Sequence, residues 1–500
     1  MTYEEAKQQY LDRREKANAI GLGFYLNSLD VETGVAPSES FAYRSKQLEV
    51  LSGMIYDMTT SPEAMESIRV LAENETDDQA LLHEVRLAAE QAEKLAKIPK
   101  EEYLAFNALL NEVYPVYVTA KQTSDFALFE PYLQKIFDYN RKYVNWVGGE
   151  KQGYDVLLDE FERDYGQKEY DEFFALLKEA IVPLVKEISG KKLQFNDSFL
   201  QYEYDVERQK EFCEYLREVC CFDRERTVML ESEHPFTTNN GSHDVRITNH
   251  FYTDNLSSSI FSAIHEMGHG LYELQVADEF EGTGSGGGAS LAMHESQSRL
   301  MENMIGRSLP FWRAHFPKLQ SIFPKELEGV TAEDFYKYVN RVEESLIRTE
   351  ADELTYSIHV LIRYEIERAV MEGKVEAKDI PALWNRKYKE YLNVDVPCDK
   401  EGCLQDSHWS GGSLGYFPTY SLGSAYAAQI YRAMERDLDM DAALGGENLR
   451  PLADWLKEHL HRYGASKFPK ELIRIATGEE FSPRYYVEYL TEKYRTLYGI

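Results

Sequence analysis

Apolar residues recur at intervals of three and four along most of this 500-residue chain, which is the spacing of helices that bury one face. The pattern predicts helices over residues 2–27, 38–59, 61–73, 77–96, 103–118, 125–143, 308–327, 332–373 and 481–500, and two more around Gly166 between residues 154 and 188. Short breaks such as Ser61-Pro62 separate these segments. The chain is therefore expected to be mainly α-helical.

Residues 227–252 have the composition of strands. They are rich in β-branched and aromatic residues, and Asn239-Asn240-Gly241 marks a turn within them. A small β-sheet is expected here, directly before the helix that carries the candidate chemistry. A strand in this place could present its backbone groups to an extended peptide.

A long loop is predicted between Val394 and Tyr420, where Gly, Asp and aromatic residues are frequent. Loops of this length in a compact protein are usually functional. Because helices dominate the rest of the pattern, residues 1–500 are interpreted as one helical unit, with the small sheet beside a deep active-site cleft.

The candidate chemistry begins with the pattern H-E-x-x-H at residues 265–269. Four residues make about one helical turn, so His265 and His269 project from the same helix face and can bind one metal ion. Glu266 lies beside that ion. From there its carboxylate can act as the general base in metal-assisted hydrolysis.

The other face of this segment supports its assignment as a helix. Its apolar residues have helical spacing: Ile260, Ile264, Met267, Leu271 and Leu274. Asp254 or one of residues 257–259 can cap the helix start. Gly268 and Gly270 each cost a helix roughly 1 kcal/mol relative to Ala. Their presence indicates that another part of the protein approaches the backbone closely there.

Two histidines leave a catalytic zinc site incomplete, because such sites usually have three protein ligands. Gln275 stands where a third histidine would lie in the pattern H-E-x-x-H-x-x-G-x-x-H, so that arrangement is excluded. A second helix is predicted from Ser290 to Gly306, after the glycine-rich residues 281–289, and it carries Glu295 as the candidate third ligand. The alternatives are His294, turned about 100° from Glu295 on the helix, and a Glu295 that is a solvated surface carboxylate.

Charge and cysteine content narrow the classes of function. The formal net charge of −31 argues against nucleic acid and anionic membrane surfaces, which call for basic patches. The five cysteines have no paired C-x-x-C spacing, which suits a reducing cytoplasm. Residues 1–16 lack the apolar segment of a signal peptide, and the sequence contains no run of 18 apolar residues that could span a membrane.

Several short motifs together resemble those of the carboxypeptidase Taq family of zinc metallocarboxypeptidases. They occur in the family's order from residue 234 to residue 409: His234-Pro235-Phe236, Asp244-Val245-Arg246-Ile247-Thr248, the H-E-x-x-H segment, His294-Glu295-Ser296-Gln297, Ile347-Arg348 with Ala351-Asp352, and Gly402-Cys403-Leu404-Gln405-Asp406-Ser407-His408-Trp409. The length of the chain also suits this family. Several motifs in order are far more specific than any one of them.

The resemblance implies a metal-dependent carboxypeptidase that removes residues one at a time from peptide C-termini with broad specificity. It implies His265, His269 and Glu295 as metal ligands and Glu266 as the catalytic carboxylate, in agreement with the reasoning from the residues. The expected cofactor is one Zn²⁺ per chain, for which Co²⁺ can substitute. The resemblance further implies a homodimer, and a lid over the cleft formed by the helices of about residues 1–100.

Four residues are candidates for substrate binding. A carboxypeptidase must neutralise the C-terminal carboxylate of its substrate, and a buried guanidinium suits this task. Arg348 is the first candidate and Arg246 the second; the alternative for Arg348 is a salt bridge within its predicted helix. His408 and Tyr420, both in the predicted loop, are candidate donors to a developing oxyanion. Each side chain also has an alternative role: His408 could belong to a structural polar network, and Tyr420 could contribute to packing.

The sequence is also compatible with two rival functions. One is a helical zinc oligopeptidase that cuts internally, with the same metal site but no group for a terminal carboxylate. The other is a non-catalytic peptide-binding protein that holds zinc for structure, which is disfavoured because structural sites usually complete their coordination with Cys or His. The family resemblance favours the carboxypeptidase, whose partners are peptides with a free C-terminus.

Overall fold

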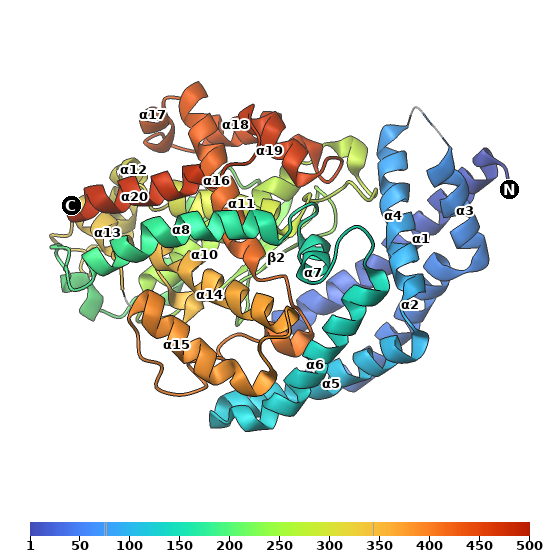
Figure 1. Ribbon diagram of the computed structural model, residues 1–500. Coiled ribbons are helices and arrows are strands. Elements are labelled where there is room, and N and C mark those ends of the chain that lie inside the picture. Colours follow the sequence, from blue (N-terminus) through green and yellow to red (C-terminus); the bar gives the residue numbers. More distant parts are fainter. Residues whose placement is uncertain (75, 77, 344) are drawn as a thin grey trace.

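Helices dominate the computed structural model, which describes residues 1–500 except residues 75, 77 and 344 (Figure 1). The described residues form twenty α-helices and one three-stranded sheet. The predicted mainly α class with a small β-sheet is therefore confirmed. Each helix in the described part of the chain is too short or too polar to cross a membrane.

Four helices at one side of the molecule form what we call the N-terminal arm (Figure 1). They are α1 (Tyr3–Glu32), α2 (Phe41–Thr60), α3 (Pro62–Glu73) and α4 (Gln79–Lys97), close to the predicted ranges. The predicted start of the fourth helix at Asp77 lies outside the described residues. The arm has a small apolar cluster of its own, made by Ala6, Ile68, Val70, Leu71, Leu81 and Val85.

The next five helices connect the arm to the sheet. They are α5 (Lys100–Thr123), α6 (Phe126–Val147), α7 (Tyr154–Phe161), α8 (Gln167–Ile188) and α9 (Val206–Val219). Asp125 caps α6 by accepting a hydrogen bond from the backbone N–H of Ala127. Gly166 immediately precedes α8, so the predicted pair of helices around this glycine is confirmed.

The sheet contains β1 (Thr227–Glu231), β2 (Thr237–Asn239) and β3 (Val245–Asn249) in the order β1-β3-β2. Strand β3 pairs in parallel with β1 and antiparallel with β2, which lies at an edge of the sheet. The predicted turn is present, with Gly241 at φ +82° and the N–H of Asn240 donating to the carbonyl of Asp244. The helix that follows, α10 (Leu256–Gln275), packs against this sheet.

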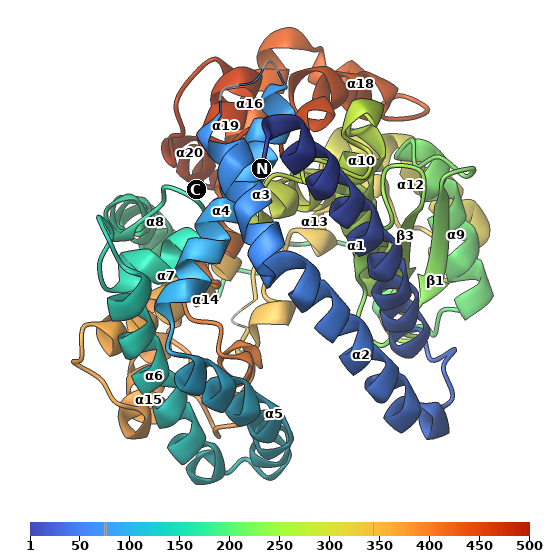
Figure 2. The same cartoon turned by 90° about the vertical axis from the view of Figure 1, so that its right-hand side faces the viewer.

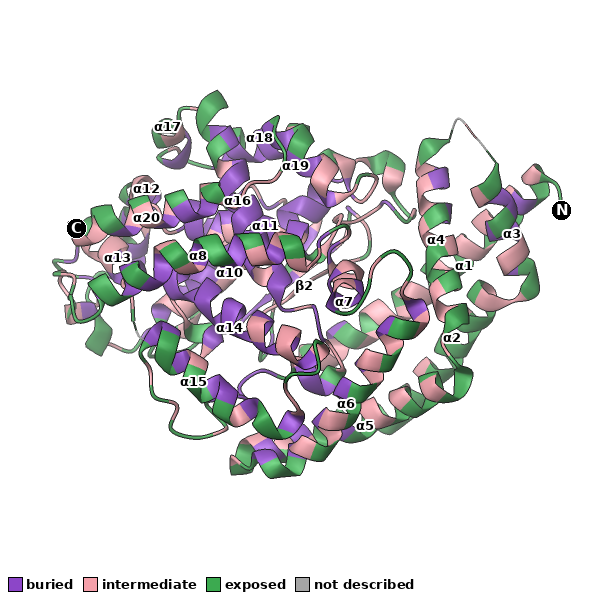
Figure 3. Cartoon of the chain, in the orientation of Figure 1, coloured by how far each residue is buried: buried purple, intermediate pink, exposed green. Residues whose placement is uncertain are grey.

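Helix α10 packs against α9 and against α11 (Leu291–Arg299), which continues into a π-helical turn at Leu300–Ile305. Helix α16 (Pro418–Asp437) packs on α11, and α14 (Glu353–Met371) packs on α16. The outer helices are α12 (Leu309–Ile322), α13 (Ala332–Val339), α15 (Ile380–Leu392), α17 (Met440–Leu444), α18 (Arg450–His459), α19 (Pro469–Thr477) and α20 (Arg484–Tyr498). The largest apolar cluster extends through these central helices, whereas the arm is mostly exposed or half-buried (Figure 3).

Two sequence predictions are wrong in detail. Residues 332–373 form two helices instead of one, because Asp352 caps a new helix by accepting from the N–H groups of Leu354 and Thr355. Arg348 consequently lies in the short 3₁₀ turn Arg348–Glu350 and not in an α-helix. The loop after Val394 ends earlier than predicted, since Pro418 begins α16, and Tyr420 belongs to that helix.

Candidate active site

Helix α10 holds the H-E-x-x-H residues against the apolar centre. The five predicted stripe residues are all buried. The helix start is capped by Asn255, which accepts from the N–H of Ser258, and not by Asp254 or a serine of residues 257–259. The predicted close approach at the glycines is confirmed. A Cβ on Gly268 would lie 2.6 Å from the carbonyl oxygen of Gln297, and one on Gly270 would lie 2.5 Å from the ring of Phe222.

His265, His269 and Glu295 come together on the facing sides of α10 and α11. The distance from Glu295 Oε2 is 3.6 Å to His265 Nε2 and 3.4 Å to His269 Nε2. One ligand atom from each of the three residues lies within 4.8 Å of the other two. Tetrahedral zinc with bonds of about 2.0–2.2 Å separates its ligand atoms by roughly 3.4 Å. The donor set and its spacing therefore fit a divalent metal ion.

The ring nitrogens that point away from this centre are also engaged. His265 Nδ1 lies 2.9 Å from Glu302 Oε2, and His269 Nδ1 lies 2.6 Å from His294 Nδ1. Such contacts fix the orientation of histidine ligands. The carboxylate of Glu295 accepts hydrogen bonds from Arg299 Nε at 2.7 Å and from the hydroxyl of Ser298 at 2.9 Å.

Burial and charge act differently on these groups. Burial lowers the pKa of His269 to about 3. Burial also opposes the charged form of His265, but Glu295 and Glu302 outweigh it and raise the pKa of that ring. Burial alone would raise the pKa of Glu295, yet the Arg299 guanidinium and the histidines hold it well below its ordinary value. Glu295 is therefore ionised, the state in which a carboxylate can bind a metal ion.

Glu266 lies beside the two histidines, and a residue of the sheet fixes its side chain by a hydrogen bond. The hydroxyl of Thr237, on the edge strand β2, donates to Glu266 Oε2 at 2.6 Å. Burial raises the pKa of the Glu266 carboxyl, while the charge of His265 and the bond from Thr237 oppose the shift. A carboxylate with a raised pKa is a better proton acceptor in the range where hydrolases work.

Arg348 lies in a second polar group, next to the candidate metal-ligand residues. Asp406 accepts from Arg348 Nε at 3.1 Å and Nη2 at 2.8 Å, and the Tyr356 hydroxyl accepts from Nη1 at 3.0 Å. The Arg299 guanidinium stacks on the same Tyr356 ring, 4.2 Å from its centroid, and bonds to Glu295. Tyr356 thus lies between the Arg348 group and the Glu295 group.

The other predicted substrate residues divide between two places. His408 and Tyr420 join the Arg348 group, with His408 Nε2 3.1 Å from the Tyr420 hydroxyl and the Tyr420 ring 4.9 Å from the Arg348 guanidinium. Arg246 is engaged elsewhere. It pairs with Asp244 at 2.7 Å and lies over the ring of Tyr25 in the N-terminal arm.

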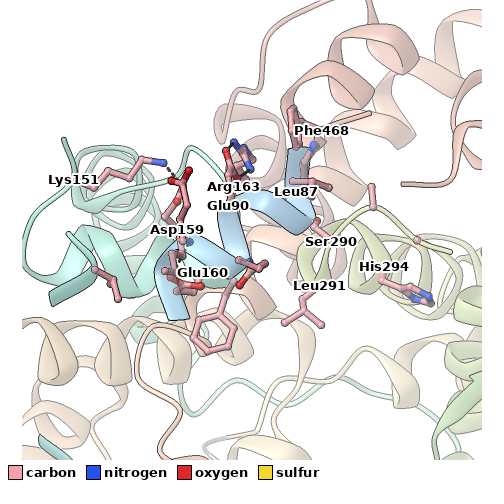
Figure 4. A pocket seen from close by; sticks show the side chains of 18 of the residues that line it. Leu87, Glu90, Lys151, Asp159, Glu160, Arg163, Ser290, Leu291, His294 and Phe468 are labelled. Carbon is pink, nitrogen blue, oxygen red and sulfur yellow. Dashed lines mark hydrogen bonds and ion pairs between the residues drawn. The ribbon is translucent and has the colours of Figure 1, made fainter. Parts of the chain in front are cut away.

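A cavity of about 660 Å³ lies between the arm, α7 and the start of α11. Figure 4 shows His294 and Leu291 on one side of it and Lys151, Asp159 and Glu160 on the other. Polar and charged side chains therefore line much of this cavity. One lining residue, His294, also touches His269, a candidate metal ligand.

Comparison with known proteins identifies the family. The family model for carboxypeptidase Taq (M32) metallopeptidases matches residues 22–494. This chain belongs to the M32 metallopeptidase family. It is 38% identical to carboxypeptidase 1 of Bacillus subtilis, with 99% of each chain covered, and 36% identical to thermostable carboxypeptidase 1 of Thermus thermophilus, with 100% of each covered. The crystal structure of the M32 carboxypeptidase from Deinococcus radiodurans R1 superposes with a TM-score of 0.94 at 33% identity, covering 99% of this chain and all of the other.

Membership of the M32 family makes this chain a metal-dependent carboxypeptidase, an exopeptidase that acts on peptides. A divalent metal ion is implied by the family, and the His265, His269 and Glu295 donor set fits one.

The sequence did not indicate every residue that shapes this M32 site. Thr237 and Tyr356 carried no signal, because their contacts depend on sheet register and on how α14 packs. Asp406 belongs to the motif of residues 402–409, but the sequence analysis predicted no role for it. The sequence places Glu302 on the same helix face as Glu295, seven residues earlier, but its contact with His265 was not predicted.

Proposed function

We propose that this chain is a zinc-dependent carboxypeptidase of broad specificity, with His265, His269 and Glu295 as metal ligands and Glu266 as the general base. The observation that carries the proposal is the position of Arg348, one aromatic ring away from the Glu295 group. A carboxylate bound by Arg348 would place the last peptide bond of a substrate near the metal ligands.

The bound zinc would polarise the peptide carbonyl and make a water molecule more acidic. Glu266 would take a proton from that water and later pass it to the leaving amine. The hydroxyl of Thr237 orients the carboxylate of Glu266 for this role, through its 2.6 Å hydrogen bond. Because burial raises the pKa of Glu266, the group can both accept and return a proton.

Arg348 retains hydrogen-bonding capacity for a substrate. A guanidinium has five N–H groups, and Asp406 and Tyr356 together accept from three of them. The remaining N–H groups belong to Nη1 and Nη2, the pair that binds a carboxylate bidentately. Asp406 and the surrounding rings thus hold Arg348 in place without occupying all of its donors.

His408 and Tyr420 form a hydrogen-bonded pair, which uses one of their two donor protons and leaves the other to donate to a developing oxyanion. Burial and the nearby Arg363 charge lower the pKa of His408 to about 3, so this ring is neutral at working pH. Burial raises the pKa of Tyr420 well above its ordinary value, so its hydroxyl keeps its proton. Neutral donors fixed in a buried site stabilise an oxyanion without reorganisation.

The test is mass spectrometry of a mid-length peptide and its C-terminally amidated twin after incubation with zinc-loaded enzyme. A ladder of single-residue losses from the free acid, and none from the amide, is expected. Glu266→Gln should abolish the ladder while zinc stays bound. Internal fragments from both peptides would instead identify an oligopeptidase.

Arg348→Met tests the carboxylate-binding role. Removing one partner of a buried charged contact costs about 2–5 kcal/mol, so kcat/KM for the free acid should fall by roughly 30-fold or more. Arg246→Met is the matched control and should leave kcat/KM nearly unchanged. The opposite ranking would transfer the role to Arg246. The melting temperature of each variant shows whether the fold survives.

Strand β2 is a candidate guide for the substrate backbone. It lies at the edge of the sheet and carries Thr237, which touches Glu266. An extended peptide could add to such an edge through main-chain hydrogen bonds. A substrate analogue should then slow hydrogen exchange of amides in residues 237–239, and unchanged exchange would count against strand addition.

We also infer that the N-terminal helices act as a lid over the active site.

The protein is further inferred to form a homodimer. Helix α2 has no buried residue but exposes large apolar side chains, including Phe41, Tyr43, Val50, Met54 and Tyr56. A second copy would cover such a surface. Light scattering should give twice the chain mass, and the double substitution Val50→Asp with Met54→Asp should reduce the measured mass to that of one chain.

We infer in addition that the protein is cytoplasmic. Its five cysteines are free thiols, which is consistent with a reducing compartment.

A further inference from the structure

His294 forms a bridge between a metal-ligand residue and a buried carboxylate. One ring nitrogen, Nδ1, lies 2.6 Å from His269 Nδ1, and the other, Nε2, lies 2.6 Å from Glu273 Oε1. Glu273 is only 5% exposed and is itself fixed, since it accepts from the N–H of Gly288 and from the side chain of Asn239. The three side chains form a continuous row, Glu273–His294–His269.

The direction of the hydrogen bonds in this row follows from the metal site. If His269 binds a metal through Nε2, its proton must be on Nδ1, which then donates to His294 Nδ1. His294 must therefore carry its proton on Nε2, where it donates to Glu273. Each donor faces an acceptor under this assignment, and each ring has a single tautomer.

The ring of His294 is also held by packing. A Cβ on Gly288 would lie 2.5 Å from His294 Cδ2 and 3.1 Å from the Tyr272 ring, so only glycine leaves room for His294 at this point. The centroids of the Tyr272 and His294 rings are 5.4 Å apart. The glycine-rich residues 281–289 therefore include a position that the placement of His294 requires.

We propose that His294, oriented by Glu273 and Gly288, is the positioning residue that sets the tautomer and ring orientation of His269 for metal binding. This rests on the proposed ligand set. His265 has a carboxylate partner directly, in Glu302, whereas His269 reaches one through His294. Loss of such a partner typically lowers metal affinity by about 10–100-fold.

The experiment measures the dissociation constant for Zn²⁺ by competition with a chromophoric chelator. His294→Phe keeps a ring but removes the acceptor, and should weaken zinc binding by about 10–100-fold. His294→Asn places its side-chain oxygen where Nδ1 lies, and should bind zinc much more tightly than the Phe variant. Zinc binding by His294→Phe within about threefold of the unaltered protein would overturn the proposal.

Two glycines give a matched test that leaves all the polar groups in place. Gly288→Ala should push the His294 ring away and weaken zinc binding. Gly287→Ala is the control, because its Cβ would lie 3.6 Å from Glu273 Oε2, an ordinary contact. Equal affinities of the two alanine variants for zinc would contradict the proposal, since only one of them disturbs the ring.

Further variants separate this idea from the proposed ligand set. His269→Ala and Glu295→Ala should lose zinc almost entirely, and if they do not, the ligand set itself is wrong. If they lose zinc but His294→Phe does not, only the positioning role fails. His294 as a direct ligand would make the Asn variant as weak as the Phe variant, which also overturns the proposal. Circular dichroism of each metal-free variant verifies folding.

Discussion

Helices α2 and α10 each contain 20 residues, but they have opposite surroundings. Fifteen residues of α10 are buried, including Glu266 and Glu273, whereas α2 buries none. Helix α10 packs on the sheet, on α9 and on α11, and its glycines admit neighbouring backbone and rings. Helix length is therefore not what distinguishes them: packing against neighbouring elements holds α10, with His265 and His269, in place.

The same contrast extends to the regions that contain these helices. The helices of the N-terminal arm lie in front of the rest of the molecule in Figure 2. Polar contacts between the two include Arg163 with Glu90 at 2.7 Å, Lys94 with Glu160 at 2.9 Å, and Asn18, which donates to the carbonyl of Gly282 at 2.8 Å. The body, by which we mean residues 100–500, is held by one extended apolar cluster. Polar surface contacts contribute little to stability, so the arm is expected to open more readily than the body.

Acid should distinguish the two regions most strongly. Burial lowers the pKa of His315 to about 4 and that of His359 and His461 to about 3, all in the body. The unfolded chain, with pKa values near 6.5, then binds more protons below that pH, so stability falls as the pH drops from 6.5 towards 3. At pH 4.5 each group should cost roughly 2–3 kcal/mol. Urea unfolding of metal-free protein at several pH values measures the loss.

A single variant tests this source of the acid sensitivity. His359→Asn keeps a polar atom near the position of Nδ1, which contacts the Tyr388 hydroxyl at 2.9 Å, but cannot take up the proton. Its stability should fall less steeply with decreasing pH than that of the unaltered protein. Parallel curves would mean that buried carboxylates, and not this histidine, control the acid response. The arm contains one histidine, His83, so most of the histidine-dependent acid response is expected in the body.

Gly268→Ala should give the next largest effect. Its Cβ would lie 2.6 Å from the Gln297 carbonyl and 2.8 Å from Ser298 Cα, which are backbone atoms of α11. Helices α10 and α11 would have to separate, at a cost of about 3 kcal/mol, and Glu295 would move away from the histidines. Urea unfolding and zinc affinity should therefore decline together, and unchanged zinc affinity would contradict the close-packing argument.

The sequence predicted the centre of the site better than its surroundings. His265, His269 and Glu295 were found because helical spacing brings the first two together and a helix after a short turn can return the third. The same reasoning failed for Arg348, because the apolar spacing continues through residues 340–352 although Asp352 starts a new helix there. Asp is a residue type that favours the start of a helix, so the sequence contained a signal for the cap at Asp352. The helical spacing of the apolar residues nevertheless led to the prediction of one continuous helix.

Contacts between distant segments could not be predicted. Arg246 meets Tyr25 of the arm, 221 positions earlier, and Thr237 reaches Glu266 only because β2 pairs with β3 in one register. Neither local spacing nor propensity contains such information. The strand region and its turn were predicted correctly, whereas the parallel pairing of β1 with β3 was not foreseen.

The same glycine substitution in the arm should have the opposite sign. Gly53 lies inside α2, and a Cβ there would meet nothing within 4 Å. Alanine removes the conformational freedom that glycine has in the unfolded chain, so Gly53→Ala should stabilise the arm by roughly 0.5–1 kcal/mol. Hydrogen exchange of the amides of α2 measures this gain. A loss would show that α2 packs against a partner, such as a second copy of the chain.

The smallest effect is expected for the ion pairs that join the arm to the body. Arg163 and Glu90 are partly exposed, so their coupling in a double-mutant cycle with alanine should be about 0.2–1 kcal/mol. It should shrink further in 1 M salt, where the screening length is about 3 Å. Native-state hydrogen exchange of α4 gives the opening free energy for each variant. A coupling well above 1 kcal/mol would mean that this pair is desolvated and holds the arm as firmly as apolar packing holds the body. The arm could then open only after both side chains had regained their hydration, and a lid that must open for each substrate would be closed too tightly to work.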